Sequence, residues 1–402
     1  MINSIFSDDF VSKKELTITD NLQIEDFAAI IDDKAGETEL EKGKMFADEV
    51  KKGFISDFEK SKELFDKGLV NETDHMAHVS TFIRTHGYIF VTYYANTHEA
   101  AEDPNFQTAR LVYCPCDDIE NKTYLDIQSA GDDCYGKKIT KVYDTILMQK
   151  DDDTLYILWT AEADGNYYRL YRTFSISEKK LGNVQVNRFK VGNITNDFSA
   201  SGIKNALAEN GLPCKKTYSD IGIMQKLSSR VEDGKVFYYT GAYSGHFTCI
   251  IKSDDLVTWE YVSQPDFPNN SEWENATYVI GDRCFYFVRQ RGDSPYGFLT
   301  VYDLVNKTWE KPVLIADCQS RGDFTFYKGN LYLFHAPIDR EHIGIVKVDT
   351  DNIADSKVLL QAHMHTSCFY PFVREFDDGF AISYTIARKH IRLARFDFEK
   401  YL

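Results

Sequence analysis

Short strands separated by turn residues repeat along most of the chain. Six copies of an aromatic-rich apolar strand each follow a turn, and these turns lie at Gly87, Asp153, Gly234, Gly281, Gly329 and Gly379. Another short strand precedes each copy and a third follows most copies, as in residues 78–84, 88–94 and 108–114. A fourth strand fits residues 123–128 and the matching position of most other repeats. Four antiparallel strands per repeat are typical of a propeller blade. The sequence therefore predicts an all-β, six-bladed β-propeller, with a five-bladed propeller as the alternative.

Segments outside the repeats predict one inserted helix and the closure of the ring. Residues 198–211 have helical spacing and end at Gly211. The last repeat lacks a fourth strand, which a propeller can take from its N-terminus, and residues 14–24 are our candidate. Residues 41–69 combine charged and apolar positions at helical spacing, which predicts a helix that caps one face. We therefore expect an N-terminal segment at 1–74 and a propeller at 75–402, forming a single domain overall.

Composition narrows the classes of molecule that the protein could bind. The formal net charge is -16, which argues against a nucleic acid or an anionic membrane as the partner. No apolar run approaches the roughly 18 to 20 residues that cross a bilayer, and the N-terminus lacks a signal-peptide pattern. The cysteines are scattered, several within apolar strands, which is typical of buried thiols in a reducing compartment. We expect a cytoplasmic protein.

Polar residues recur where the first strands of a propeller begin, and there they would converge on one axial pocket. Asp144, Asp220 and Glu274 open three successive first strands. Facing carboxylates let one group act as an acid and another as a base at a glycosidic bond. We predict a catalytic role for these three residues; the alternative is that they cap strand ends or bind loop amides.

Arginines predict that the ligand is anionic. Arg289, Arg291, Arg321 and Arg340 come from neighbouring repeats, and a guanidinium group binds a carboxylate with two parallel hydrogen bonds. This favours a uronate or sialate sugar; pairing with nearby aspartates is the alternative. The residues that we predict to bind substrate are Arg289, Arg321, Arg340, Tyr143, Tyr218, Tyr370, His335 and His365.

Histidines open both the first and the last repeat. Ring closure would bring together His75, His78, His363 and His365. Such a cluster could bind a metal such as zinc, or one imidazole could transfer a proton. We expect no cofactor, and we place His78 among the catalytic candidates.

Two turns carry a resemblance to a known superfamily. SDDLVTWE at 253–260 and YDLVNKTWE at 302–310 each place an Asp-Leu turn before a Trp-bearing strand. They resemble the Asp-box, or BNR repeat, of sialidase-like propellers, and also a turn of the five-bladed glycoside hydrolases of families 43 and 32. The resemblance covers residues 75–398 and implies a structural turn between third and fourth strands. The Phe/Tyr-Arg-Ile-Pro motif of sialidases is missing.

Residues 78–98 resemble the opening blade of polysaccharide lyases with the sialidase fold. The resemblance implies an active-site role for His78, which begins the strand before a Gly-Tyr-Ile turn. In such a lyase a Tyr or His removes a proton beside a uronate carboxylate, and an Arg neutralises that carboxylate. The matching partners would be Tyr143, Tyr218 or Tyr370, with Arg321 as the neutralising group.

These patterns together favour a carbohydrate-active enzyme. We expect hydrolysis of a glycosidic bond in a small acidic oligosaccharide by carboxylate acid–base chemistry. Two alternatives stay open: a lyase that uses His78 with a tyrosine, and a non-catalytic propeller that binds a glycan or a protein.

Overall fold

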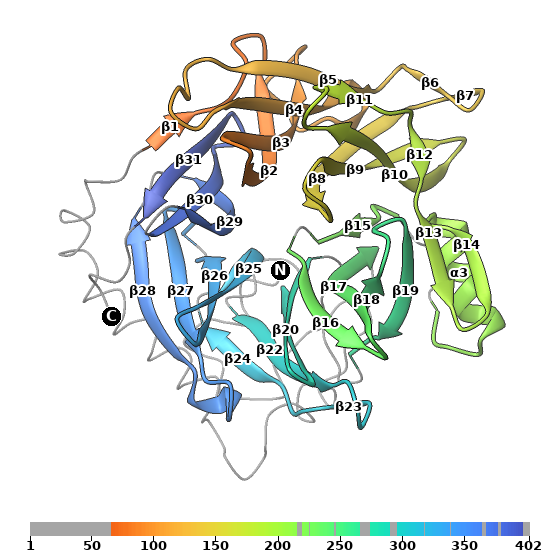
Figure 1. The fold of residues 1–402 in the computed structure, drawn as a ribbon, viewed down its shortest axis with the longest axis vertical. Coiled ribbons are helices and arrows are strands. Elements are labelled where there is room, and N and C mark those ends of the chain that lie inside the picture. The colour runs from red at the N-terminus through yellow and green to blue at the C-terminus, as the bar shows by residue number, and fades with distance from the viewer. Residues whose placement is uncertain are drawn as a thin grey trace, which may run out of the picture.

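The computed structural model describes residues 66–214, 219–224, 226–244, 247–265, 274–289, 296–316, 318–337, 339–363, 367–376 and 379–396. These residues form six sheets of four or more strands, one two-stranded ribbon and one α-helix, with two short 3-10 helices. The fold is all-β and propeller-like. Figure 1 shows the sheets around a common centre, with β8, β15, β20, β25 and β29 close to it.

The sheets follow one another along the chain. The first contains β2 (Met76–Thr85), β3 (Tyr88–Asn96), β4 (Gln107–Pro115) and β5 (Thr123–Ser129). The second contains β8 (Lys141–Gln149), β9 (Thr154–Ala163), β10 (Asn166–Ser175), β11 (Lys180–Leu181) and β12 (Gln185–Val186). The third contains β13 (Arg188–Val191), β14 (Ile194–Asp197), β15 (Gly222–Ile223), β16 (Ser228–Glu232), β17 (Lys235–Ser244), β18 (Phe247–Ser253) and β19 (Thr258–Ser263).

The remaining sheets complete the circle. The fourth contains β20 (Asn275–Ile280), β21 (Arg283–Arg289), β22 (Tyr296–Asp303), β23 (Thr308–Trp309) and β24 (Val313–Ala316). The fifth contains β25 (Gln319–Tyr327), β26 (Asn330–Ala336), β27 (His342–Val348) and β28 (Lys357–His363). The sixth contains β29 (Cys368–Phe376), β30 (Gly379–Ile386), β31 (His390–Phe396) and β1 (Asp66–Gly68). The ribbon pairs β6 (Asp133–Cys134) with β7 (Lys137–Lys138), and the 3-10 helices are η2 (Pro104–Phe106) and η3 (Ile353–Asp355).

Local turn chemistry explains several of the hairpins. Gly87, Gly234 and Gly329 have φ values of 73°, 78° and 79°, and the residue before each also has positive φ. Two consecutive residues with positive φ form the tight turn whose twist matches that of paired strands. The turns that join β2 to β3, β16 to β17 and β25 to β26 therefore lie where the sequence predicted them.

The sixth sheet takes its outer strand from the beginning of the described chain. Strand β1 pairs antiparallel with β31, with Asp66 opposite Ala394 and Gly68 opposite Arg392. Strand β2 also contacts β29, β30 and β31, so the first and sixth sheets are neighbours. Residues 66–68 lie within the 41–69 segment for which we predicted a helix, and at these positions that prediction is wrong. The rest of that segment, and the strand predicted at 14–24, lie outside the described residues.

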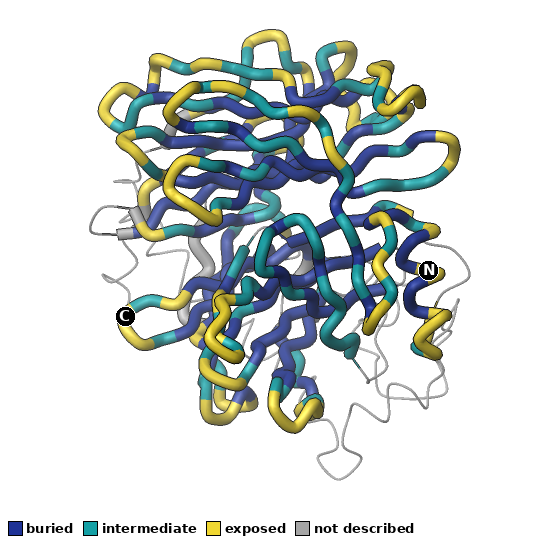
Figure 2. The backbone as a smooth tube through the Cα atoms, turned by 45° about the vertical axis from the view of Figure 1, so that its right-hand side comes forward, coloured by how far each residue is buried: buried dark blue, intermediate teal, exposed yellow. Residues whose placement is uncertain are grey.

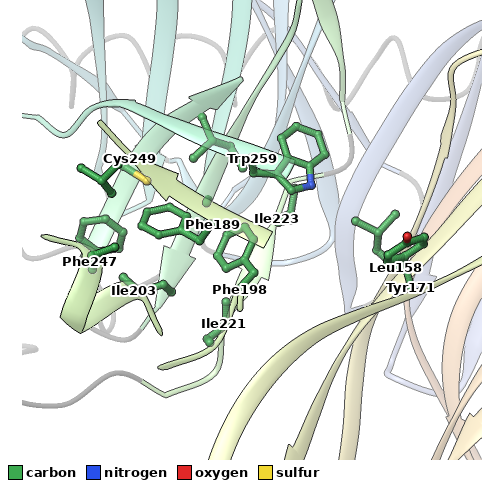
Figure 3. Packing of buried hydrophobic residues seen from close by; sticks show 14 of the residues in the cluster. Leu158, Tyr171, Phe189, Phe198, Ile203, Ile221, Ile223, Phe247, Cys249 and Trp259 are labelled. Carbon is green, nitrogen blue, oxygen red and sulfur yellow. The ribbon is translucent and has the colours of Figure 1, made fainter. Parts of the chain in front are cut away.

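The predicted inserted helix is confirmed as α3 (Ala200–Glu209). Its first turn is capped by the Ser199 hydroxyl, which accepts a hydrogen bond from the Gly202 amide at 3.0 Å. Its apolar face, including Ile203, packs into a cluster of buried residues that also contains Phe198 and Trp259, beside the third sheet (Figure 3). Burial of this face, and not helix propensity, holds so short a helix in place.

The two Asp-Leu turns lie where the sequence predicted them, between β18 and β19 and between β22 and β23. Asp255 accepts hydrogen bonds from the Val257 and Thr258 amides at 2.8 and 2.7 Å. Asp303 accepts from the amides of Val305 and Asn306, both at 2.8 Å. The aspartates thus hold the turn backbone and have a structural role.

Burial follows the sheets, as Figure 2 shows: the strands are mainly buried and the exposed residues gather at the turns. Apolar contacts between sheets form several separate clusters instead of one central core. No helix formed by the described residues has the length and apolarity that crossing a membrane requires.

A buried ion pair links three sheets across the centre. Lys226, after β15, places its Nζ 3.1 Å from Asp323 Oδ2 on β25 and also donates to the Val373 carbonyl on β29. The Asp323 carboxylate accepts the Val373 amide at 2.8 Å. Burial lowers the pKa of Lys226 to about 8, although Asp323 opposes that shift. These side chains tie together the third, fifth and sixth sheets.

Candidate functional site

A polar pocket of about 290 Å³ lies where the first strands converge. Six of the residues that we predicted for the site line it: Asp144, Asp220, Glu274, Arg321, Tyr143 and Tyr370. The other lining residues are Val79, Tyr94, Glu102, Pro104, Gln107, Lys141, Tyr167 and Tyr243. The pocket therefore draws side chains from all six sheets, and its volume is close to the lower end of the range for small-molecule sites.

A repeated backbone irregularity turns these side chains toward the pocket. Val79, Asp144, Asp220 and Tyr370 each have a φ between 51° and 55°, and Ser320, just before Arg321, has a φ of 73°. The pairing of β2, β8, β25 and β29 with their neighbours shifts register at these positions. A residue in this left-handed region costs about 1 to 3 kcal/mol, and such strain gathers at functional sites. Four of the five strained residues line the pocket.

Asp144 is held by two buried arginines and a tyrosine. Its Oδ1 accepts from Arg321 Nη2 at 2.7 Å, and its Oδ2 accepts from the Tyr243 hydroxyl at 2.9 Å and from Arg169 Nη1 at 3.4 Å. Both arginines are at most 1% exposed. Three donors, two of them guanidinium groups, therefore hold this carboxylate in place.

Glu274 and Tyr370 form the second cluster. Glu274 binds Arg289 through Oε2, has Arg321 Nη2 at 3.7 Å from Oε1, and accepts a hydrogen bond from the Tyr370 hydroxyl. Burial alone would raise the pKa of Glu274, but Arg289, Arg321 and the phenol together hold it below its ordinary value. Burial and the charge of Glu274 raise the pKa of Tyr370. Glu274 is thus an ionised carboxylate that accepts a hydrogen bond from the neutral phenol of Tyr370.

Asp220 has the opposite electrostatic environment. Burial, and then the negative charges of Asp144 and Glu274, raise its pKa to about 7, although Arg321 opposes them. Its carboxyl group is hydrogen-bonded to Tyr143, which also lines the pocket. A carboxyl group with a pKa near neutrality can hold and release a proton under ordinary conditions.

His78 lies behind Tyr370 instead of lining the pocket. It is 1% exposed, its ring stacks on that of Tyr370 with centroids 4.6 Å apart, and its Nδ1 is 3.1 Å from the Thr385 hydroxyl. Burial lowers the pKa of His78 well below its ordinary value, and the charges of nearby arginines lower it further. The neutral imidazole supports one face of the Tyr370 ring.

Three arginines lie beside Phe369 and Tyr370. Arg289 Nη1 is 3.5 Å from the Tyr370 hydroxyl, and the guanidinium groups of Arg340 and Arg388 lie over the Phe369 ring at 4.8 and 5.5 Å. Burial lowers the pKa of Arg340 to about 10, with further lowering by Arg289 and Arg388. Because like charges repel, this cluster favours an anion among its members.

The other predicted residues are placed as follows. His335 is fully buried on β26, where its ring packs against Gly344 of β27, and it does not line the pocket. His75 is exposed, while Tyr218, His365 and the His363 side chain lie outside what the structure describes. Within the described part of the chain, no group of three or more His, Cys, Asp or Glu side chains could hold a metal ion.

Two site residues, Arg169 and Arg388, were missed at the sequence level, whereas Tyr243 carries a signal: it ends the second strand of its repeat, where the sequence predicts that a propeller places pocket residues. Arg169 carried no such signal, because in the sequence a buried arginine in the middle of a third strand cannot be told from a solvent-exposed arginine. Arg388 lies in the turn between β30 and β31, and it reaches the site through an ion pair with Glu102 at 3.0 Å.

Comparisons with known proteins find similar folds among solved structures. No protein-family model matches the chain, and no curated protein matches it either. A Dyadobacter fermentans protein of unknown function has a similar structure, with a TM-score of 0.53 and 14% identity over 82% of this chain and 97% of its own.

Two sialidases also share the fold. A variant of the NanB sialidase from Streptococcus pneumoniae has a TM-score of 0.52 and 9% identity, over 84% of this chain and 70% of its own. The Hadza microbial sialidase Hz136 has a TM-score of 0.54 and 10% identity, over 82% of this chain and 67% of its own. At such low identity the likeness shows the fold alone: the chain has the sialidase-like propeller fold that its turns and strands resembled.

Proposed function

We propose that the chain is a glycoside hydrolase that cleaves an acidic sugar from a small oligosaccharide. One observation carries this proposal: the pocket holds a tyrosine hydroxyl bonded to an ionised carboxylate, together with a second carboxyl group whose pKa is near 7. A nucleophile beside a base, with a proton donor in the same pocket, is what two-step glycosidic cleavage requires. A propeller that only binds its ligand needs no such paired titratable groups.

The roles follow from the environment of each group. Tyr370 oxygen attacks the anomeric carbon while its proton passes to Glu274, and Asp220 gives its proton to the departing glycosidic oxygen. A water molecule then returns a proton to Asp220 and attacks the anomeric carbon, and the released Tyr370 oxygen recovers its proton from Glu274. The enzyme ends each cycle in its starting state.

Asp144 takes a different role from the acid–base function that the sequence predicted. Its oxygens accept hydrogen bonds from Arg321, Tyr243 and Arg169. We assign Asp144 to holding Arg321 beside Glu274, and to keeping a negative charge that raises the pKa of Asp220.

The arginine cluster supports a carboxylate-bearing sugar. Arg289 Nη1 lies 3.5 Å from the hydroxyl of the proposed nucleophile, and Arg340 and Arg388 lie over the neighbouring Phe369 ring. A sugar carboxylate would give guanidinium groups here a bidentate partner. The likeness to two sialidase structures supports the same choice of substrate class. We also propose that the six sheets of four or more strands are the blades of a six-bladed propeller.

Product analysis tests the proposal. Purified protein is incubated with sialate- and uronate-containing oligosaccharides, and products are identified by mass spectrometry together with near-ultraviolet absorbance. We expect hydrolysis of at least one substrate, abolished in Tyr370→Phe and Asp220→Asn but retained in the control Tyr238→Phe, which alters a tyrosine outside the pocket. An unsaturated uronate product would instead favour the lyase alternative, in which the neutral His78 acts with Tyr370. Sugar binding without any turnover would favour a non-catalytic propeller.

A further inference from the structure

In the half of the pocket formed by the first two sheets, several lining residues, among them Gln107, Lys141 and Tyr167, have no role in the proposed chemistry. Gln107, at the start of β4, is 0% exposed. Neither its Oε1 nor its Nε2 makes a hydrogen bond to any described residue. Buried polar groups in folded proteins nearly always have a partner, so an amide left without one at a pocket wall indicates a ligand.

Hydrogen bonds hold the loop beside Gln107 in place. Asn96, paired with Gln107 across β3 and β4, accepts the His98 and Glu99 amides at 2.8 and 3.1 Å and donates to the Ala101 carbonyl at 3.0 Å. These bonds fix the loop that leads to Glu102.

Glu102 anchors the same loop to two other elements. It accepts the Tyr94 hydroxyl at 2.6 Å and pairs with Arg388. Such a preformed wall favours a specific ligand, because little ordering is needed on binding.

Tyrosine rings and one paired cation also line this half of the pocket. Tyr143 and Tyr167 lie edge to face with ring centroids 6.4 Å apart. Lys141 Nζ is 2.5 Å from Glu162 and 3.2 Å from the Tyr167 hydroxyl. Lys141 is thus paired with Glu162, and Glu102 is paired with Arg388.

We propose that Gln107 is the centre of a subsite for a neutral pyranose. A side-chain amide offers both a donor and an acceptor, which matches the hydroxyl groups of a sugar ring, and tyrosine rings cover the apolar faces of that ring. The link between the two halves is Tyr143, which lines this subsite and is bonded to Asp220. If the proposed function holds, the subsite binds the leaving-group sugar beside the carboxyl group that protonates the glycosidic oxygen.

Direct binding tests the subsite without requiring turnover. Methyl β-D-galactoside, methyl β-D-glucoside and the methyl glycoside of N-acetylglucosamine are titrated into the protein and followed by ligand-observed NMR. We expect at least one to bind to the wild type and to Asp220→Asn. Gln107→Leu should weaken that binding at least tenfold. The control is Gln128→Leu, which changes a buried glutamine of β5 that does not line the pocket, and it should bind as the wild type does.

The folded state gives a second readout. Since the Gln107 amide has no partner among the described residues, Gln107→Leu should unfold at the same or a higher temperature than the wild type, which separates lost binding from lost folding. The inference is overturned if none of the three glycosides binds to the wild type, or if Gln107→Leu binds them equally well. If the protein binds a glycoside but hydrolyses no acidic oligosaccharide, the proposed function is contradicted and the subsite is still supported.

Discussion

Ionisation of Asp220 should destabilise the folded protein, so replacing it by asparagine should increase stability at high pH. The pKa of this group is about 7 in the fold against an ordinary 3.8, mainly because of burial and then because of Asp144 and Glu274. A carboxyl group with a raised pKa binds its proton more tightly in the folded state. Its stabilising contribution is therefore complete below about pH 4 and is lost as the pH rises to about 7.

The size of the effect follows from the pKa difference. Each pH unit between the two pKa values corresponds to about 1.4 kcal/mol, so the full loss is about 4 kcal/mol. About two of these pH units lie above pH 5. Between pH 5 and pH 8 the wild type should therefore lose about 3 kcal/mol of unfolding free energy relative to Asp220→Asn, which keeps the shape of the side chain but cannot ionise.

Urea unfolding of both proteins at pH 5 and pH 8 measures this difference. The control is Asp144→Asn, the same chemical change in the same pocket. Asp144 compensates the buried Arg321 and Arg169, so this variant should lose about 3 to 5 kcal/mol at pH 5. It should lose less at pH 8, because ionised Asp220 then no longer faces the charge of Asp144. If Asp220→Asn tracks the wild type within about 0.5 kcal/mol at both pH values, the electrostatic account of the pocket is refuted. The same substitution should abolish turnover, which would make Asp220 a site where stability is given up for activity.

Four further outcomes are expected. The kcat/KM for hydrolysis should fall as the pH rises above about 7, because Asp220 loses its proton; a pH–rate profile flat to pH 9 would remove Asp220 as the acid. Tyr370→Phe should lower kcat at least about 10³-fold while leaving substrate affinity within a few fold. Steady-state kinetics measure kcat and equilibrium titration measures affinity; a loss of affinity with an unchanged kcat would show that Tyr370 acts only in binding. Lys226→Met leaves Asp323 buried without its partner and should cost about 3 to 5 kcal/mol in chemical denaturation; a neutral result would show that the pair contributes nothing. Gly222→Ala places a Cβ 1.9 Å from the Tyr243 ring and should cost about 1 to 3 kcal/mol in a thermal melt, together with activity; an unchanged variant would contradict this packing.

Local structure could be predicted from the chain without its tertiary contacts. Alternating strands and glycine turns set the hairpins, since a two-residue turn with positive φ depends on residues adjacent in the chain. The same holds for α3, whose apolar face and cap lie within one segment. The position of Asp144, Glu274 and Arg321 at the starts of first strands also sufficed to predict that they meet, because a propeller brings all such positions to one axis.

The proposed role of each carboxyl group depends on contacts between sheets. The carboxyl groups of Asp144 and Asp220 occupy equivalent positions in the sequence, yet one is held by arginines and the other faces like charges. The difference depends on side chains from other sheets, such as Arg169 and Tyr243, and on backbone irregularities that turn a residue from one face of a strand to the other. Gln107 reads in the sequence as one more polar residue at a strand end, and only burial at the pocket wall sets it apart. A pKa, a partner or an unpaired amide is a property of neighbours in space, which strand periodicity does not specify.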